Sequence, residues 1–267
     1  VEAAAAAVSA MESSGIFDAG RGGVLNLDGE VELDCGIMCG RSLDYGAVVG
    51  VKRIENPVSL ARFILESSDG SARILSREGA EKIAGKNGFS LVENDQLVCE
   101  RERSRYRELL RKLENYHTSH PFLPSDDVPR GTVGCVARDR AGGLAAATST
   151  GGTPMRPAGR VGDSALPGAG YYASGSAACS ATGWGEAITA SLLAGRSVDG
   201  VEAGGVPAEV LCAVLERMRT SIRNRDGRGA TGGLILLDSE GSGAFAFSTP
   251  HMARAGWSEG GEGWAAV

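Results

Sequence analysis

Thr132 has the residue type and the surroundings that nucleophilic catalysis requires. It directly follows Gly131, at the end of the proline-containing stretch 121–129, and it begins the apolar segment 132–139. Cleavage of the bond between Gly131 and Thr132 would free an α-amino group, whose ordinary pKa of about 7.7 to 8.0 suits a general base. Thr132 would then carry its own base. A threonine at the start of a strand is otherwise explained by its high β propensity. The neighbouring residues must therefore decide whether Thr132 is catalytic.

Two motifs could place further polar groups beside Thr132. If segments 132–139 and 143–150 pair as a hairpin, the hydroxyl of Thr150 returns to the start of the first segment. Thr182 and Gly183 precede a predicted helix, where a hydroxyl and a backbone amide could stabilise an oxyanion. The alternative for this second motif is a helix cap with close packing.

Arg160 and Asp163 lie on a loop punctuated by glycines, Gly159-Arg160-Val161-Gly162-Asp163. A guanidinium is a planar fork for a carboxylate and an aspartate accepts hydrogen bonds from an ammonium group. The pair therefore suits the head group of a free amino acid, and a surface ion pair is the alternative.

Other catalytic chemistries lack the residues they need. The sequence has only three histidines, His117, His120 and His251. The first two lie in the presumed linker, so a Ser/His/Asp triad is disfavoured. Asp34, Cys35 and Cys39 lie close together without the second pair that a zinc tetrad requires, and the glycines lack a nucleotide-binding spacing. We expect no cofactor for catalysis.

The elements that must position these groups alternate along the chain. Helices are predicted at 1–12, from Pro57 with Asn56 as its cap, and at 78–86, 100–117, 186–193 and 206–224. Strands are predicted at 23–27, 31–38, 46–51, 132–139, 143–150, 177–182, 232–238 and 244–248. Helix 100–117 mixes both charges, which indicates a solvated helix, with a basic interaction surface as the alternative. This order is typical of layered α/β structure.

Composition indicates one domain that folds in water. The 267 residues include 42% hydrophobic and 22% charged side chains, and the formal charge is −6. An acidic chain is a poor candidate for nucleic-acid binding, and no apolar run approaches the roughly 20 residues that span a bilayer. We therefore expect a small-molecule or dipeptide substrate, and neither a nucleic-acid nor a membrane partner. The six scattered cysteines indicate buried thiols in a reducing compartment, hence a cytoplasmic protein.

Several motifs follow one another in a fixed order: Gly-Thr-Val-Gly from 131, Thr-Ser-Thr-Gly-Gly from 148, Gly-Arg-Val-Gly-Asp from 159, Gly-Ala-Gly from 168 and Ala-Thr-Gly-Trp-Gly-Glu from 181. Upstream come Phe-Asp-Ala-Gly-Arg-Gly from 17, Val-Glu-Leu-Asp from 31 and Asn-Pro-Val-Ser-Leu-Ala-Arg from 56. With these motifs and the segment 232–252, the sequence closely resembles the plant-type L-asparaginase and isoaspartyl aminopeptidase family of N-terminal-nucleophile hydrolases. Glycosylasparaginase and the threonine aspartase are related families.

The resemblance implies an αββα sandwich, an α/β fold of four layers, made as a precursor of one domain (1–267). Cleavage before Thr132 would give an α chain (1–131) and a β chain (132–267), usually as a dimer of such heterodimers, with 100–130 as a variable linker.

The resemblance also implies a role for each candidate residue. Thr132 would be the nucleophile, assisted by Thr150, and Thr182 and Gly183 would form the oxyanion hole. Arg160 would hold the α-carboxylate of the substrate, and Asp163 and Gly185 its amino group. In relatives a structural sodium ion binds main-chain carbonyls of the loop that matches Met11, Glu12, Ser14, Phe17, Ala19 and Arg21.

The sequence departs from the family pattern in three places. It begins inside the first helix, so the N-terminal strand with its His-Gly-Gly motif is absent, and we expect a gap in the sheet. Asp18 stands where many relatives have Asn, and its carboxylate would raise the pKa of the Thr132 amine. Cys39 replaces the Asp of a Met-Asp-Gly motif.

These observations predict a self-cleaving threonine amidohydrolase that releases L-aspartate from L-asparagine or β-aspartyl dipeptides. A threonine endopeptidase of the aspartase type is the enzymatic alternative. The non-enzymatic alternative is a truncated, inactive paralogue that binds a partner through helix 100–117.

Overall fold

The computed structural model describes residues 1–67, 70–111 and 131–267, and its first sheet has five strands in the order β3-β2-β1-β5-β4. These are β1 (Leu33–Cys39), β2 (Tyr45–Val51), β3 (Ile74–Ser76), β4 (Val133–Arg138) and β5 (Leu144–Thr150). All neighbours are antiparallel except β2 and β3. Strand β1 precedes Thr132 in the sequence and β5 follows it, so the pairing of these two strands joins the two parts of the chain in one sheet.

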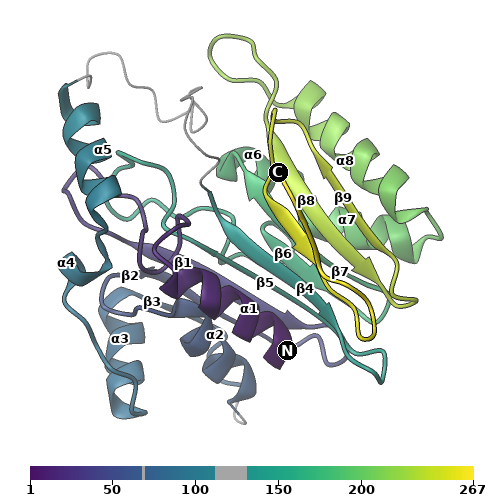
Figure 1. The fold of residues 1–267 in the computed structure, drawn as a ribbon, viewed down its shortest axis with the longest axis horizontal. Helices are drawn as coiled ribbons and strands as arrows, with labels where there is room; N and C mark the ends of the chain where they lie inside the picture. Colours follow the sequence, from purple (N-terminus) through teal and green to yellow (C-terminus); the bar gives the residue numbers. More distant parts are fainter. Residues whose placement is uncertain (68–69, 112–130) are drawn as a thin grey trace.

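Helices cover the outer face of this sheet (Figure 1). They are α1 (Glu2–Ser13), α2 (Pro57–Glu66) and α3 (Arg77–Lys86). Their apolar faces, including Val8, Val58 and Leu60, are buried against strand residues such as Ile37. The short helix α4 (Asn94–Leu97) and helix α5 (Glu100–Arg111) follow, and α5 lies against the loop after α1.

The second sheet is antiparallel throughout, in the order β6-β7-β8-β9. It comprises β6 (Tyr171–Ala173), β7 (Ala177–Gly183), β8 (Gly232–Asp238) and β9 (Gly243–Phe247). Helices α6 (Gly185–Ser191), α7 (Leu193–Glu202) and α8 (Pro207–Ser221) pack on its outer face, with Ile188, Leu211 and Leu234 in the core between them.

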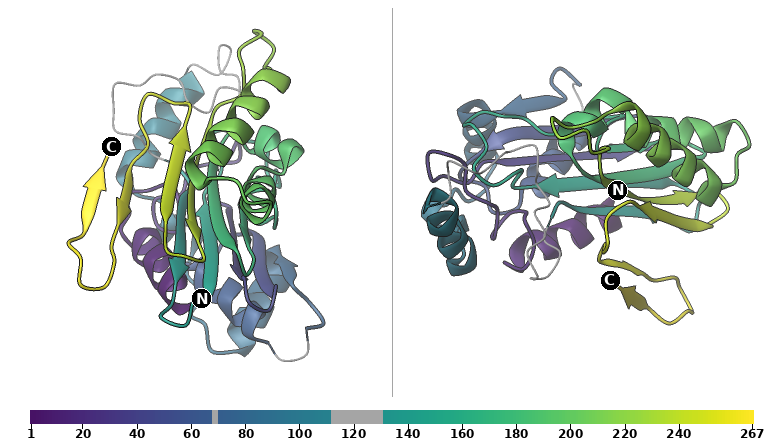
Figure 2. Two further views of the ribbon diagram at one scale, coloured as in Figure 1. Left: turned by 90° about the vertical axis from the view of Figure 1, so that its right-hand side faces the viewer. Right: turned by 90° about the horizontal axis from the view of Figure 1, so that it is seen from above.

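The inner faces of the two sheets pack against each other, so the molecule has four layers in the order αββα (Figures 1 and 2). Small residues allow this close approach. A Cβ on Gly36 would meet the ring of Tyr171 at 2.1 Å, and a Cβ on Gly134 would meet Ser180 Oγ at 2.0 Å. The predicted αββα fold is confirmed.

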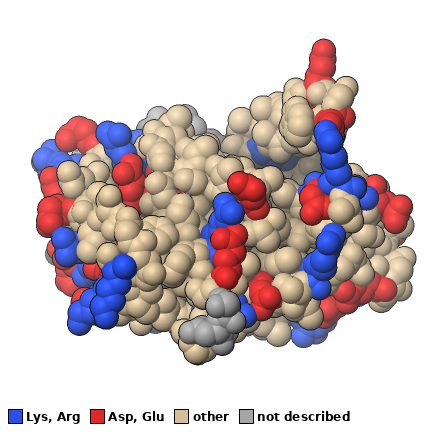
Figure 3. Space-filling model, turned by 90° about the horizontal axis from the view of Figure 1, so that it is seen from below, with Lys and Arg blue, Asp and Glu red and all other residues tan. Residues whose placement is uncertain are grey.

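A last hairpin, β10 (Arg254–Gly256) and β11 (Trp264–Ala266), forms its own two-stranded sheet and projects from the body (Figure 2). On the face drawn in Figure 3, acidic and basic side chains are interspersed among the described residues. None of the described helices is both long and apolar enough to cross a membrane.

Most predicted elements are present within a few residues, but several expectations were wrong. The first sheet has no gap, since its five strands pair in unbroken order. Residues 23–27 form no strand, because Asn26 Oδ1 accepts the backbone N–H groups of Asp28 and Glu30 in a turn. Asn56 is the N-cap residue of α2 as predicted, but its side chain makes no capping hydrogen bond, and its Nδ2 donates to Ser9 O and Ser13 Oγ.

The other three concern helices and thiols. The helix predicted at 186–193 ends at Ser191, because Leu192 adopts a left-handed conformation with φ of 51° before α7. Helix α5 is not simply solvated, since Glu102 is buried, and residues 112–117 lie outside the described part. All six cysteines are free, but Cys212 is exposed.

Candidate active site

The β4/β5 hairpin brings two threonine hydroxyls together. Val133 pairs with Ser149, so Thr132 at the head of β4 lies opposite Thr150 at the end of β5. Thr132 Oγ1 donates to Thr150 Oγ1 at 3.0 Å. Thr150 Oγ1 also accepts the backbone N–H of Gly152 at 2.9 Å, which fixes its orientation. The expected second hydroxyl therefore lies within hydrogen-bond distance of the first.

A small cavity surrounds the Gly131–Thr132 bond. It measures about 30 Å³ and is lined by Asp18, Val24, Arg105, Gly131, Thr132, Gly152, Thr153, Pro154, Thr182 and Gly183. Thr182 Oγ1 lies 3.8 Å from the point that a Cβ on Gly131 would occupy. The cavity has room for about one water molecule, so an amino-acid substrate does not fit while Gly131 forms part of the wall.

Gly183 occupies a position that no other residue fits. Its φ is +144°, and a Cβ there would come within 2.5 Å of Gly232 Cα and of the Thr231 carbonyl oxygen. The backbone of β7 therefore turns beside β8 and enters α6, with the hydroxyl of Thr182 left in the cavity wall. This turn places the predicted oxyanion residues next to the predicted scissile bond.

The three residues expected to hold the head group form a second cluster. A Cβ on Gly185 would lie 2.7 Å from Arg160 Nη2 and 2.9 Å from Asp163 Oδ1. Burial raises the pKa of Asp163 to about 7, although the nearby Arg160 favours the charged form. None of the three lines the cavity at Thr132, but Gly185 is only two residues from Gly183, which does.

Arg160 already has a carboxylate partner. Its Nε and Nη2 donate to the two carboxylate oxygens of Glu186, both at 2.9 Å. Burial opposes ionisation of Glu186, but the hydrogen bonds from Arg160 outweigh it and lower the pKa of that carboxyl. A bidentate pair of this kind shows that the guanidinium is oriented for a carboxylate.

Asp18 is a buried carboxylate in the wall of the cavity at Thr132. Its Oδ1 accepts the backbone N–H of Val24 at 2.9 Å, and its carbonyl oxygen accepts that of Gly151. Burial raises the pKa of this carboxyl to about 7, and the hydrogen bond from Val24 offsets only part of that effect. The group therefore changes charge close to neutral pH.

Similarity to known proteins agrees with this geometry. The model of a family described as asparaginase matches residues 1–266. The chain belongs to this asparaginase family. It is 40% identical to the isoaspartyl peptidase/L-asparaginase of Xenopus laevis over 93% of this chain and 76% of that protein. It is also 40% identical to the plant-type L-asparaginase of Pyrobaculum calidifontis over 98% of this chain and 84% of that protein. The isoaspartyl peptidase of Salmonella typhimurium is 40% identical over 93% of this chain and 78% of its own length.

The loop expected to bind sodium follows α1 in this asparaginase-family chain. The carbonyl oxygens of Phe17 and Gly15 converge on Gly22, where a Cβ would meet them at 2.7 and 3.0 Å. Carbonyl oxygens suit a hard cation, but that of Gly15 already accepts a hydrogen bond from the Arg101 guanidinium at 2.9 Å. Those of Met11 and Glu12 accept hydrogen bonds from Ser14 and Arg21. The fit is thus best at the Phe17 side of the loop.

Two residues of the site escaped the sequence analysis. Glu186 was part of a quoted motif, but its pairing with Arg160 joins α6 to a loop 26 residues away, which spacing does not reveal. Arg105 was read only as one charge on a mixed-charge helix, and it lines the cavity at Thr132. No sequence pattern signalled this, because the burial of Glu102 one turn before Arg105 is seen only in the structure.

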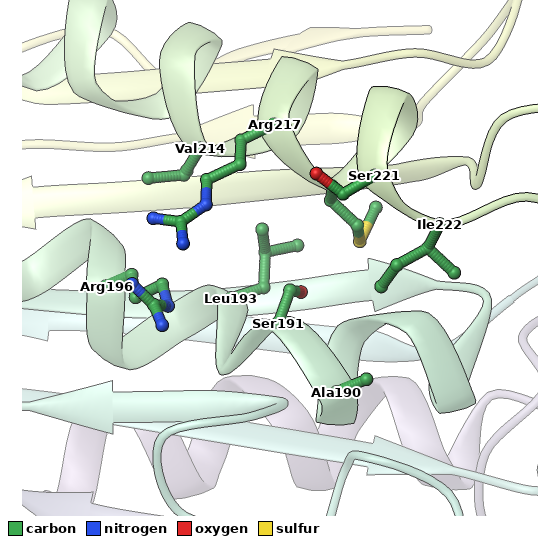
Figure 4. A pocket seen from close by; sticks show the side chains of 9 residues that line it. Ala190, Ser191, Leu193, Arg196, Val214, Arg217, Ser221 and Ile222 are labelled. Atoms are coloured by element: carbon green, nitrogen blue, oxygen red, sulfur yellow. The ribbon is translucent and has the colours of Figure 1, made fainter.

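A larger hollow of about 270 Å³ lies between α6, α7 and α8 (Figure 4). Side chains from all three helices face it, including Ser191, Arg196, Arg217 and Ser221. Its lining has no carboxylate, histidine or cysteine that could act as a base for either serine. The described lining of this hollow therefore lacks the paired hydroxyl groups that the cavity at Thr132 has.

Proposed function

We propose that this chain is a self-cleaving threonine amidohydrolase that releases L-aspartate from L-asparagine and β-aspartyl dipeptides. The observation that carries the proposal is the hydrogen bond of 3.0 Å between Thr132 Oγ1 and Thr150 Oγ1, next to the Gly131–Thr132 bond. The printed names of the relatives, isoaspartyl peptidase and L-asparaginase, support the substrate class.

Self-cleavage would use the same hydroxyl as turnover. Thr132 Oγ attacks the carbonyl carbon of Gly131 and the acyl group moves from nitrogen to oxygen. Water then hydrolyses the ester, which leaves a carboxylate on Gly131 and a free amine on Thr132. Because Gly131 lines the cavity, its departure enlarges the space in front of the nucleophile.

In turnover the amine of Thr132 accepts the hydroxyl proton as Oγ attacks the side-chain carbonyl of the substrate. The proton passes to the leaving ammonia or amino acid as the C–N bond breaks. Water then hydrolyses the β-aspartyl ester and releases aspartate. Thr182 and Gly183 would stabilise the oxyanion in both steps.

The head group of the substrate would bind at the second cluster. Arg160 would hold its α-carboxylate, and Asp163 and Gly185 its ammonium group. Glu186 presently accepts two hydrogen bonds from Arg160, so it either shares the guanidinium with the substrate or is displaced.

We also infer a structural sodium ion in the loop 11–21, held by carbonyls such as that of Phe17, and a dimer of αβ heterodimers. The sodium would keep the loop that carries Asp18 in place, because backbone carbonyls crowd together without it. A cytoplasmic location is our inference from the free thiols.

The decisive test is aspartate release from β-aspartyl-leucine and L-asparagine, with an internal Asp-Gly peptide as the comparison. We expect release from the first two, no cleavage of the third, and formation of aspartate β-hydroxamate when hydroxylamine competes with water for the ester. Cleavage of the peptide alone would favour the endopeptidase, and a single uncleaved chain of 27.4 kDa without aspartate release would favour the binding protein.

A further inference from the structure

Helix α5 is held firmly against the loop that carries Asp18. Glu102, with 2% of its side chain exposed, pairs with Arg101 at 2.9 Å. Arg101 Nη1 donates to the carbonyl oxygen of Gly15 at 2.9 Å. The hydroxyl of Tyr106 donates to the carbonyl oxygen of Leu27 at 3.1 Å. This part of the α5 region is therefore a fixed wall of the site.

Arg105 lies one turn after Glu102 on the face of α5 that meets the cavity. Its guanidinium is 3.6 Å from Glu102 Oε2, a carboxylate that Arg101 holds more closely, and the side chain is 33% exposed. Among the described residues, Arg105 has this one ion pair and also acts through its charge on Asp18 in the same cavity wall. A guanidinium has five N–H donors, so most of them are left for a ligand. The cavity that Arg105 lines also contains Thr132.

Arg105 and Arg160 lie at different places relative to the cavity at Thr132. Arg160 does not line the cavity at Thr132, whereas Arg105, Thr153 and Pro154 do. A substrate whose head group lies at Arg160 and whose scissile carbonyl lies at Thr132 would extend its leaving group into the space beside these three residues. The leaving amino acid of a β-aspartyl dipeptide carries an α-carboxylate there, whereas L-asparagine leaves only ammonia.

We propose that Arg105 binds the α-carboxylate of the leaving amino acid and so makes β-aspartyl dipeptides with a free C-terminus better substrates than L-asparagine. This proposal rests on the proposed function and adds a determinant of its substrate choice. Charge-assisted hydrogen bonds from a guanidinium to a carboxylate are strong enough to set such a preference.

The test compares Arg105→Gln with the matched variant Arg103→Gln. Arg103 lies on the same helix, is 35% exposed, pairs with Asp95 and does not line the cavity. Three substrates are used: β-aspartyl-leucine, its C-terminal amide and L-asparagine. Rates are normalised to the amount of chain that begins at Thr132.

For Arg105→Gln we expect kcat/KM on β-aspartyl-leucine to fall about tenfold, mainly through KM, because a charge-assisted hydrogen bond to substrate is lost. The kcat/KM values for the amide and for L-asparagine should change less than about twofold, since neither substrate presents that carboxylate. Arg103→Gln should leave kcat/KM for all three substrates within about twofold of the wild-type value. Arg105→Lys should recover part of the loss on β-aspartyl-leucine.

An equal fall on all three substrates, or no fall on β-aspartyl-leucine, overturns the role of Arg105 while leaving the proposed function intact. Failure of the wild-type protein to release aspartate from any of the three overturns the proposed function, and the role of Arg105 with it.

Discussion

At the residue scale, the chemistry depends on the charge beside one amine. In the intact chain the nitrogen of Thr132 is a peptide nitrogen, and cleavage would turn it into a base with an ordinary pKa of about 7.7 to 8.0. Asp18 lines the same cavity and has its pKa raised by burial to about 7. An ionised carboxylate near an amine favours the protonated form of the amine, which is inactive as a base.

Asp18→Asn should therefore move the acidic limb of the pH profile of kcat/KM to lower pH by about one unit. Asn keeps the oxygen that accepts the N–H of Val24, so the loop should remain in place. The profile is measured with L-asparagine between pH 5 and pH 9, where the limb reports the amine together with Asp163, whose contribution this substitution leaves in place. A limb that stays in place, or moves to higher pH, would show that Asp18 does not act on the amine.

Sequence motifs located Thr132, Thr150, Thr182 and Gly183 because each lies at the end of a predictable strand or at a helix start. They did not reveal that Arg160 is occupied by Glu186 or that Arg105 reaches the cavity. Both facts depend on how separate elements pack, and side-chain contacts across 26 residues leave no periodic pattern in the sequence.

At the element scale, the site depends on how closely the two sheets approach. Short apolar runs bounded by turn residues predicted β4, β5, β7 and β8, and β5 is buried along its whole length, as expected of a strand covered on both faces. The three-residue strand β6 escaped prediction, since three residues carry too little pattern. Its Tyr171 nevertheless fills the space over Gly36 of β1 and thereby sets the distance between the sheets.

Gly36→Ala should lower the free energy of unfolding by about 1–3 kcal/mol, because the new methyl group overlaps the ring of the fully buried Tyr171. Gly79→Ala is the matched control. Nothing lies within 4 Å of its Cβ position in α3, so alanine there should stabilise the protein by about 0.5–1 kcal/mol.

Both substitutions are best made in a Thr132→Ala background, so that one chain unfolds reversibly in urea. Equal midpoints for Gly36→Ala and the background protein would contradict the tight packing between the sheets.

At the scale of the whole molecule, three of the buried carboxyl groups among the described residues have a pKa raised by burial. Burial raises the pKa of Glu12 to about 8, and those of Asp18 and Asp163 to about 7. An unfolded chain would release these protons near pH 4, whereas the folded protein keeps them up to neutral pH. Their protonated forms therefore stabilise the folded state below pH 4, and this contribution falls steadily as pH rises from about 4 until it is gone above 7 to 8.

The free energy of unfolding of Thr132→Ala should consequently fall by a few kcal/mol between pH 6 and pH 8.5, at about 1.4 kcal/mol per pH unit for each of these groups that still keeps its proton in the folded state. Urea unfolding at the two pH values measures it. Adding Asp18→Asn should reduce the fall, because one of the three groups no longer titrates. Greater stability at pH 8.5 than at pH 6 would contradict the burial of these carboxyls in their protonated form.

The central claim is that Thr132 becomes the amino-terminal nucleophile of its own β chain. Intact-mass and N-terminal sequence measurements on the purified protein test it most directly, with Thr132→Ala beside the wild type. We predict two wild-type fragments, 1–131 and 132–267, the second beginning Thr-Val-Gly-Cys, and one uncleaved, inactive chain for the variant. Cleavage of Thr132→Ala at the same bond, or aspartate release by a wild-type chain that stays whole, would contradict the account.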